Sequence, residues 1–246
     1  MAANETFIKT SELYIVMPAY NEEANIDAVV AQWHPVVEQI GNGSRLLIVN
    51  DGSSDSTYRK MVSLQEQYPL LLPVDKHNSG HGATCLFACR QAIDAGAGYI
   101  FQTDSDGQTN PDEFWEFWKN RDKYDFIIGS RDARQDGVMR VFVTHVLRWV
   151  VWLMFGEWVK DANTPFRLMK TERLIPVLHF IPDDFFLSNV AICVIAVKRK
   201  EACRWLPISF KPRQGGENSI NMKRIFKIGW KAFGDFRSIN KQLKKS

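Results

Sequence analysis

The chain has 246 residues, of which 45% are hydrophobic, so it carries enough apolar material for the core of one α/β domain. Its formal net charge of +3 is too small to indicate a nucleic-acid-binding protein, and no basic stripe interleaved with aromatic residues is present. The four cysteines lack metal-knuckle spacing. Cys85 and Cys89 fall four apart in an apolar helical pattern, which predicts reduced core residues.

The first hundred residues repeat one pattern, in which an apolar strand is followed by a polar loop. Short apolar runs at residues 13–17, 45–49, 70–76 and 99–103 have the length and composition of buried strands. Helical patterns separate the runs. This alternation predicts a mainly parallel sheet with right-handed crossovers, flanked by helices. The polar clusters then all fall at carboxyl ends of strands, on one rim of the sheet.

An acidic loop follows the fourth run. Asp104 and Asp106 alternate at the carboxyl end of a predicted strand, where open α/β sheets bind ligands, and Gln108 comes next. Hard oxygen donors at this spacing suit Mg²⁺ or Mn²⁺ shared with the phosphates of a substrate. A short acidic motif is by itself more often a solvated turn, but the repeated strands and polar clusters favour the metal site here.

Three ordered motifs carry a resemblance to a known family. They are Val16 to Glu22 (with Pro18, Tyr20 and Asn21), Val49 to Ser53 (with Asn50, Asp51 and Gly52), and Asp104 to Gln108. Together they resemble the inverting family-2 glycosyltransferases with a Rossmann-like GT-A fold. Within that family, the chain is most similar to the branch of dolichyl-phosphate mannose synthase and polyprenyl-phosphate glycosyltransferases. The resemblance covers roughly residues 12–220.

The resemblance implies roles for individual residues. The nucleoside or nucleotide-sugar would contact Pro18, Tyr20, Glu22, Val49, Asp51, Asp104 and Ser105. The metal would be held by Asp106 and Gln108, together with Asp104. Asn50 stands where many members have aspartate. We expect a tail at residues 1–11, a GT-A domain at 12–219 and a basic amphipathic helix at 220–246.

Arginines of the second half are candidates for phosphate contact. Arg131 follows the strand-like residues 125–129, where it can form a fork onto a diphosphate oxygen or simply cap a surface turn. The resemblance assigns it the diphosphate. Arg213 and Ser219 lie in a stretch that resembles the family's loop over the nucleotide-sugar. Ile220 stands where a lysine is often found, and Lys223 can substitute for it.

Two stretches suit a lipid surface. Residues 141–159 are rich in tryptophan, but charged residues interrupt them and the uncharged part is too short to span a bilayer. They form either a core helix or a helix at the membrane interface, with Trp149, Trp152 and Trp158 at headgroup depth. Residues 221–243 have the pattern of a basic amphipathic helix, which suits an anionic lipid surface or packing on the protein's own sheet.

The predicted function is metal-dependent, inverting transfer of a sugar from a GDP- or UDP-linked donor. The resemblance points to a polyprenyl phosphate acceptor, for which no strong base is needed because a phosphate oxygen is already anionic near neutral pH. A saccharide hydroxyl would need a base such as Asp184. Asp183 and Asp184 also suit the N-terminal cap of a helix, and we slightly prefer this interpretation. We expect a cytoplasmic enzyme, because residues 1–12 are polar, with peripheral membrane contact at most.

Two other classes fit less well. A nucleotidyltransferase would want a glycine-rich basic loop after the first strand, whereas residues 18–23 are acidic and lack glycine. An inactive nucleotide-binding module is consistent with Asn50 and Ile220 but not with the intact acidic triplet.

Overall fold

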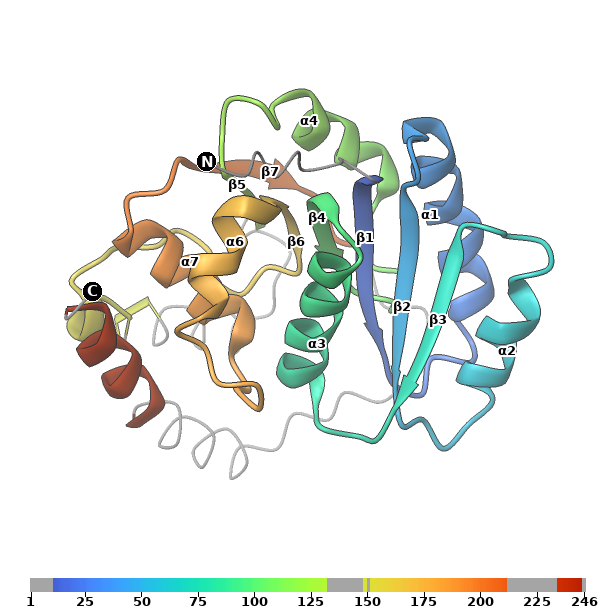
Figure 1. Ribbon diagram of the computed structural model, residues 1–246, viewed down its shortest axis with the longest axis horizontal. Helices are drawn as coiled ribbons and strands as arrows, with labels where there is room; N and C mark the ends of the chain where they lie inside the picture. The colour runs from blue at the N-terminus through green and yellow to red at the C-terminus, as the bar shows by residue number, and fades with distance from the viewer. Residues whose placement is uncertain (1–10, 132–147, 150, 212–233, 245–246) are drawn as a thin grey trace, which may run out of the picture.

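The computed structural model describes residues 11–131, 148–149, 151–211 and 234–244. In this part of the chain, seven strands form one sheet in the order β3-β2-β1-β4-β6-β5-β7 (Figure 1). The strands are β1 (Ser11–Ala19), β2 (Arg45–Asp51), β3 (Leu71–Lys76), β4 (Ala97–Thr103), β5 (Phe126–Arg131), β6 (Phe166–Lys170) and β7 (Cys203–Ile208). Only β6 runs antiparallel to its neighbours among them, so the predicted mainly parallel sheet is confirmed.

Helices cover both faces of the sheet. One face carries α1 (Ile26–Ile40), α2 (Thr57–Leu64), η1 (Pro111–Glu113) and α4 (Phe114–Lys119), and the other carries α3 (His81–Asp94), α6 (Thr171–Leu178) and α7 (Ser188–Lys198). The second face also carries the helical residues 148–149 and 151–155, here called the tryptophan helix, and 234–243, here called the C-terminal helix.

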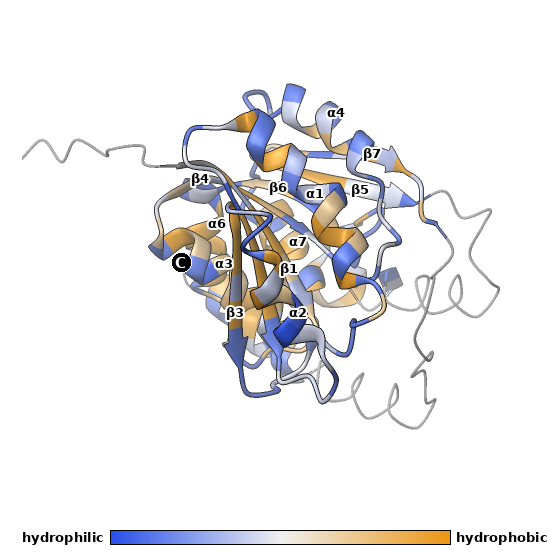
Figure 2. Ribbon diagram, turned by 90° about the vertical axis from the view of Figure 1, so that its right-hand side faces the viewer, coloured by the Kyte–Doolittle hydropathy of each residue, from blue (hydrophilic) through white to orange (hydrophobic). Residues whose placement is uncertain are grey.

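The inner strands are mostly apolar because both of their faces are buried. In β1, Tyr14 and Val16 pack toward α3, while Leu13, Ile15 and Met17 pack toward α1. Figure 2 shows the resulting hydrophobic strands enclosed between the helices. This two-sided burial explains why the parallel strands read as continuous apolar runs rather than as alternating patterns.

The order of the strands reverses between β1 and β4. From β1, the chain proceeds outward to β2 and β3, and then returns to place β4 on the other side of β1. Ligands of open α/β sheets bind in the crevice at such a point, outside the carboxyl ends of the strands. The loops after Ala19 and Thr103 border this crevice.

Several predictions about single segments can be compared with the structure. Cys85 and Cys89 are buried and not disulfide-bonded, as expected of reduced core residues, and the same holds for Cys193. The helix-cap interpretation of the 183–184 acids is wrong, because α7 begins at Ser188 with Leu187 at its N-cap position. Among the described residues, none of the helices has both the length and the hydropathy needed to cross a bilayer.

Candidate active site

The acidic loop is anchored on both sides. Ser105 Oγ donates a hydrogen bond to the carbonyl oxygen of Pro18, at 2.7 Å, which ties the loop to the end of β1. The backbone N–H of Gln108 donates to Asp106 Oδ1 at 3.1 Å. Lys211 N–H donates to the Gln108 carbonyl at 2.8 Å, and Gln108 Nε2 donates to the Lys211 carbonyl at 2.9 Å. The loop is therefore held between β1 and the segment after β7.

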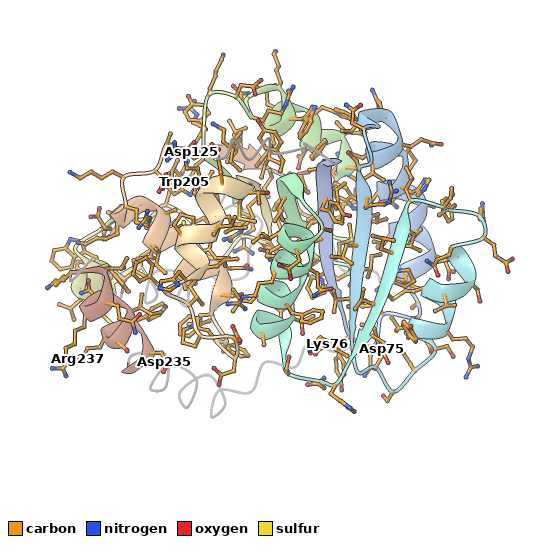
Figure 3. The ribbon with its side chains drawn as sticks, in the orientation of Figure 1. Asp75, Lys76, Asp125, Trp205, Asp235 and Arg237 are labelled. Atoms are coloured by element: carbon orange, nitrogen blue, oxygen red, sulfur yellow. The ribbon has the colours of Figure 1, made fainter. Side chains whose placement is uncertain are left out.

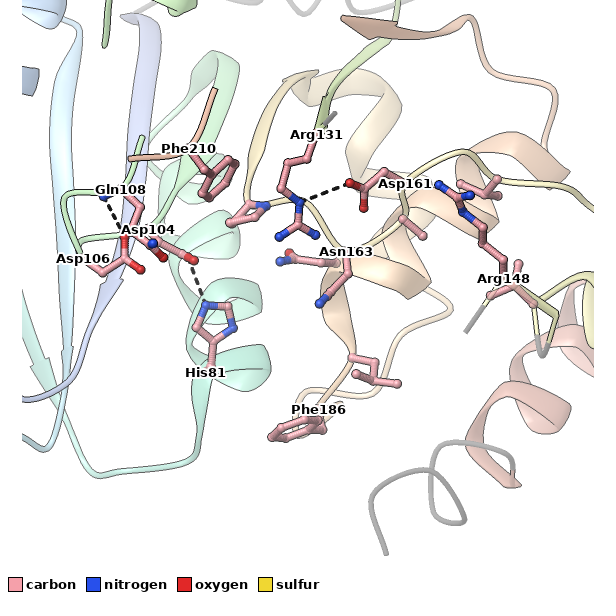
Figure 4. Close-up of a pocket in the computed structure, with 16 residues that line it drawn as sticks. His81, Asp104, Asp106, Gln108, Arg131, Arg148, Asp161, Asn163, Phe186 and Phe210 are labelled. Atoms are coloured by element: carbon pink, nitrogen blue, oxygen red, sulfur yellow. Dashed lines mark hydrogen bonds and ion pairs between the residues drawn. The ribbon is translucent and has the colours of Figure 1, made fainter. Parts of the chain in front are cut away.

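A cavity of about 380 Å³ opens beside this loop. Figure 4 shows Asp104, Asp106 and Gln108 on one side of it, and Arg131, Asp161 and Asn163 on the other, with Arg148 beyond them. Its remaining lining residues are His81, Val151, Val159, Ala162, Pro165, Phe186, Leu187, Asn189 and Phe210. One wall therefore carries two carboxylates, and the facing wall carries two guanidinium groups together with the Asp161 carboxylate, which pairs with Arg131.

His81 connects the acidic wall to helix α3. It is the first residue of α3, and its Nε2 lies 3.0 Å from Asp104 Oδ1. The Cys85 sulfur, 3.8 Å from His81 Nδ1, and the Asp104 carboxylate raise the pKa of His81 well above its ordinary value, against the effect of burial. The His81 imidazole thus lies within hydrogen-bond distance of the carboxylate proposed for the metal.

Close backbone contact fixes the start of α3. A Cβ at Gly82 would lie 2.1 Å from the carbonyl oxygen of Phe186 and 2.5 Å from that of Phe185. Because neither backbone atom can move aside as a flexible side chain would, glycine is required at this contact. The absence of a side chain lets the segment before α7 approach His81, so both border the cavity.

Arg131 is held by neighbours from two segments, the one before β6 and the one after β7. Its Nε lies 3.3 Å from Asp161 Oδ2, and this carboxylate is almost fully buried. Its guanidinium carbon lies 5.3 Å from the ring centroid of Phe210. A guanidinium in this setting can still form a fork onto an anion in the cavity.

Arg148 lies on the tryptophan helix and also lines the cavity. Its Nε is buried and makes no hydrogen bond to the part of the chain that the structure describes. A buried guanidinium N–H without a partner costs free energy, which a bound anion would recover.

Arg167 fixes the wall opposite the acidic loop. This side chain is 1% exposed, and its guanidinium donates to the carbonyl oxygens of Ala162, Thr164 and Asn189, the last at 2.8 Å. Ala162 and Asn189 both line the cavity. One buried cation thus joins the segment before β6 to the first turn of α7.

Asp51 organises the loop between β3 and α3. Its carboxylate accepts hydrogen bonds from Lys76 Nζ and from the backbone N–H groups of Ser79 and Gly80, both at 2.9 Å. Figure 3 shows Lys76 at the carboxyl end of β3. Burial opposes ionisation of Asp51, but the hydrogen bonds from Lys76, Ser79 and Thr84 outweigh burial and lower its pKa. The predicted contact with the nucleoside stays a prediction, because these donors already engage the carboxylate.

We expect Asp51→Ala to lower the free energy of unfolding by about 3 kcal/mol, since Lys76 would lose its buried partner. Urea denaturation measures this change, and Asp27→Ala, which breaks the exposed pair with Lys60, should cost less than about 1 kcal/mol. Because the folded pKa of Asp51 is lowered, its contribution is present above about pH 4 and is lost as pH falls toward the folded pKa. The difference between wild type and Asp51→Ala should therefore shrink in acid.

The same variant tests the predicted nucleoside contact. Calorimetry of nucleoside diphosphate binding should show affinity reduced roughly tenfold to a hundredfold if Asp51 contacts the nucleoside. An unchanged dissociation constant, together with lower stability, would confine Asp51 to shaping the loop.

Other predicted nucleotide residues lie at the ends of β1 and β2. Tyr20 is exposed, Glu22 is buried and accepts from Asn25 Nδ2 at 2.6 Å, and the Val49 side chain is part of the core. Asn50 donates to Asp75 Oδ1 at 2.6 Å. An aspartate at position 50 would place two carboxylates together, so the departure from the family has a local reason.

Three predicted contacts of the second half lie outside the described residues: Arg213, Ser219 and Lys223. Asp184 is described and exposed, but it is not among the residues that line the cavity. The neighbouring Asp183 pairs with Arg90 at 2.8 Å. Of the carboxylates described, those lining the cavity are Asp104, Asp106 and Asp161.

The acidic wall fits a hard divalent cation. Within the described ranges, no three His, Cys, Asp or Glu side chains are assembled as a metal cluster. Asp104 and Asp106 nevertheless both present carboxylate oxygens to the cavity, with the Gln108 amide beside them. One or two carboxylates completed by substrate phosphates and water are the usual environment of Mg²⁺.

Sequence reasoning did not assign His81, Arg148, Asn163 or Asp161 to the site. They come from three segments of the chain that only tertiary packing brings together. One signal was local, because residues 161–168 resemble the family's Asp-x-x-x-Gly-Phe-Arg-Leu segment, with Pro165 where glycine is common. The charges within the apolar run, Arg148 above all, were the other available signal, since a charge there needs a partner or a function.

The comparisons with known proteins show that the chain is a glycosyltransferase. Residues 14–193 match Glycosyl transferase family 2, and the chain belongs to this family. One relative is the UDP-N-acetylglucosamine–dolichyl-phosphate N-acetylglucosaminyltransferase of Methanococcus voltae, 26% identical over 216 residues, which are 80% of this chain and 84% of that protein. Another is the undecaprenyl-phosphate 4-deoxy-4-formamido-L-arabinose transferase of Salmonella paratyphi B, 21% identical over 87% of this chain and 64% of the relative.

Solved structures confirm the GT-A fold. Glucosyl-3-phosphoglycerate synthase from Mycobacterium tuberculosis in complex with phosphoglyceric acid superposes with a TM-score of 0.69 at 16% identity, covering 93% of this chain and 80% of that one. The same enzyme in complex with Mn²⁺, uridine diphosphate and phosphoglyceric acid gives a TM-score of 0.67 at 16% identity, covering 94% and 78%.

Proposed function

We propose that the protein transfers a sugar from a uridine diphosphate sugar to a polyprenyl phosphate, with inversion at the anomeric carbon. The observation that carries this proposal is the single cavity with Asp104 and Asp106 on one wall and Arg131 and Arg148 on the other. The named acceptors of two relatives, dolichyl phosphate and undecaprenyl phosphate, support it, as does the uridine diphosphate bound to a related fold.

The acidic wall is the donor side. Asp104, Asp106 and Gln108 would hold Mg²⁺ or Mn²⁺, which when bound neutralises the charge that develops on a diphosphate leaving group. Gln108 Nε2 is occupied by the Lys211 carbonyl, so Oε1 is the amide atom that faces a cation. Arg213, Ser219 and Lys223 are proposed to complete the nucleotide-sugar site.

The basic wall is the acceptor side. Arg148 would bind the phosphate of the acceptor and hold one of its oxygens against the anomeric carbon, on the face opposite the leaving group. Arg131, which lies between Arg148 and the acidic wall, would contact the diphosphate, as the resemblance implies. With a second pKa of about 6, a phosphate monoester is already anionic near neutral pH, so the attacking oxygen needs no base.

A saccharide hydroxyl acceptor is less well supported. It would require a base, and Asp184 is absent from the described lining of the cavity. Asp161 does line the cavity, but its carboxylate is paired with Arg131. The geometry therefore favours an acceptor that arrives already charged.

Transfer assays with a panel of UDP- and GDP-linked sugars test the proposal. With undecaprenyl or dolichyl phosphate in detergent, we expect a lipid-linked product from a UDP-sugar, with the anomeric configuration opposite to that of the donor by NMR. 3-Phosphoglycerate is the matched control acceptor, because it carries a phosphate but is soluble in water. Product only with a soluble saccharide, or retention of configuration, would contradict the proposed acceptor or the proposed stereochemistry.

A further inference from the structure

Four large apolar side chains stand exposed around the tryptophan helix. The exposed fractions are 58% for Trp149, 45% for Trp152, 73% for Leu153 and 58% for Trp158. The ring of Trp149 packs edge to face on Trp152 at 5.6 Å and on Trp158 at 5.9 Å between centroids. The three indoles and Leu153 thus form one contiguous group, here called the tryptophan patch. Clustered apolar exposure of this kind marks an interaction surface.

The opposite face of the same helix belongs to the enzyme. Val151 and Phe155 are buried in the core, and Arg148 and Val151 line the cavity. The helix is therefore already docked by its inner side, so its core contacts do not require the four outer side chains. The core-helix alternative therefore holds for the inner face, and the outer face is left for another contact.

Cations lie beside the patch. The C-terminal helix packs against the tryptophan helix through Phe155 and Phe236, whose rings are 5.6 Å apart, and Asn240 Nδ2 donates to the Met154 carbonyl. It exposes Arg237, Lys241 and Lys244, and Lys160 is exposed two residues after Trp158 (Arg237 is labelled in Figure 3). The acids in this neighbourhood are Glu157, which pairs with Lys198 at 3.8 Å, and the partly buried Asp235.

We propose that the tryptophan patch docks the protein on an anionic lipid bilayer, with the indoles in the headgroup region and Leu153 at the acyl boundary. Indoles favour this depth because they join an apolar ring to an N–H donor. Neighbouring Lys and Arg suit anionic headgroups, whereas lysine is depleted at protein–protein interfaces. Docking would place Arg148, on the inner face of the docked helix, within one helix width of the bilayer surface.

Binding to vesicles that contain no polyprenyl phosphate tests this inference apart from the proposed acceptor. Wild type should sediment with vesicles of phosphatidylcholine and phosphatidylglycerol, release as salt rises, and show tryptophan quenching by brominated lipids. The triple variant Trp149→Ser/Trp152→Ser/Leu153→Ser should partition at least about tenfold less, because the apolar area available for burial is removed. The matched control is Val62→Ser/Ile175→Ser, which removes exposed apolar side chains elsewhere and should bind like wild type.

Thermal unfolding of each variant separates docking from folding. The triple variant should keep the wild-type midpoint, and a lowered midpoint would be resolved with the single variant Leu153→Ser, whose side chain is the most exposed of the four. The inference would be overturned if the wild type did not bind anionic vesicles, or if the triple variant bound them as well as the wild type does. A wild-type dimer in ultracentrifugation that the triple variant lacks would instead assign the patch to a second copy of the chain.

Discussion

Asp106→Ala should reduce sugar transfer by at least about 1000-fold while leaving the fold intact. The carboxylate lines the cavity in a loop that Ser105 and the side chain of Gln108 also hold, so its removal leaves Asp104 alone on the acidic wall while those bonds to the loop remain. A metal and its ligands at a diphosphate supply several kcal/mol of stabilisation to the developing charge, and each 1.4 kcal/mol is a factor of ten in rate.

Two measurements accompany the assay of Asp106→Ala. Calorimetry of Mn²⁺ with uridine diphosphate should show a binding event in wild type that the variant lacks. Asp112→Ala, an exposed carboxylate in the next turn, is the matched control and should transfer at the wild-type rate. Equal wild-type turnover in EDTA and in Mn²⁺ would remove the metal from the mechanism, and wild-type turnover by Asp106→Ala would remove Asp106.

Arg148→Met should raise the KM for the polyprenyl phosphate about 10- to 100-fold, the effect of losing charge-assisted hydrogen bonds. Methionine keeps an unbranched stem but has no donor for an anion. Because Arg148 lies on the wall away from the acidic loop, the affinity for uridine diphosphate should stay unchanged.

The control for Arg148 is Arg204→Met, an exposed guanidinium on β7, with wild-type kinetics expected. Steady-state kinetics at saturating donor separate KM from kcat. A variant that loses affinity for donor and acceptor alike would indicate a damaged cavity, and one with an unchanged acceptor KM would exclude Arg148 from the acceptor site.

The parallel half of the sheet could be predicted from sequence because burial on both faces leaves long apolar runs, as in β1, β2 and β4. The placement of β6 could not. In β6, Leu168 pairs with Phe101 of β4 and with Ile127 of β5. Nothing local in residues 166–170 specifies that this strand lies between β4 and β5, or that it runs antiparallel to both. The pairing of strands so far apart in the sequence is determined by the packing of the whole core.

The site divides in the same way. Asp104, Asp106 and Gln108 belong to one loop, so their proximity follows from their spacing. His81, Arg148 and Asp161 join them only through tertiary packing. The mistaken helix cap has a related cause, since two acids before an apolar run look alike whether a helix starts directly or four residues later, at Ser188.

The buried guanidinium of Arg167 has a consequence for how acceptor preference can diverge. Because it binds the backbone carbonyls of the cavity wall, the course of the chain there does not depend on which side chains project from it. Asn163 and Phe186 border the cavity and are exposed, so they can be exchanged with little strain on the wall. Arg167 thus fixes the backbone of the wall while the side chains that project from it can change. Acceptors with different headgroups and lipid chains can therefore be accommodated by substitutions that leave the backbone unchanged.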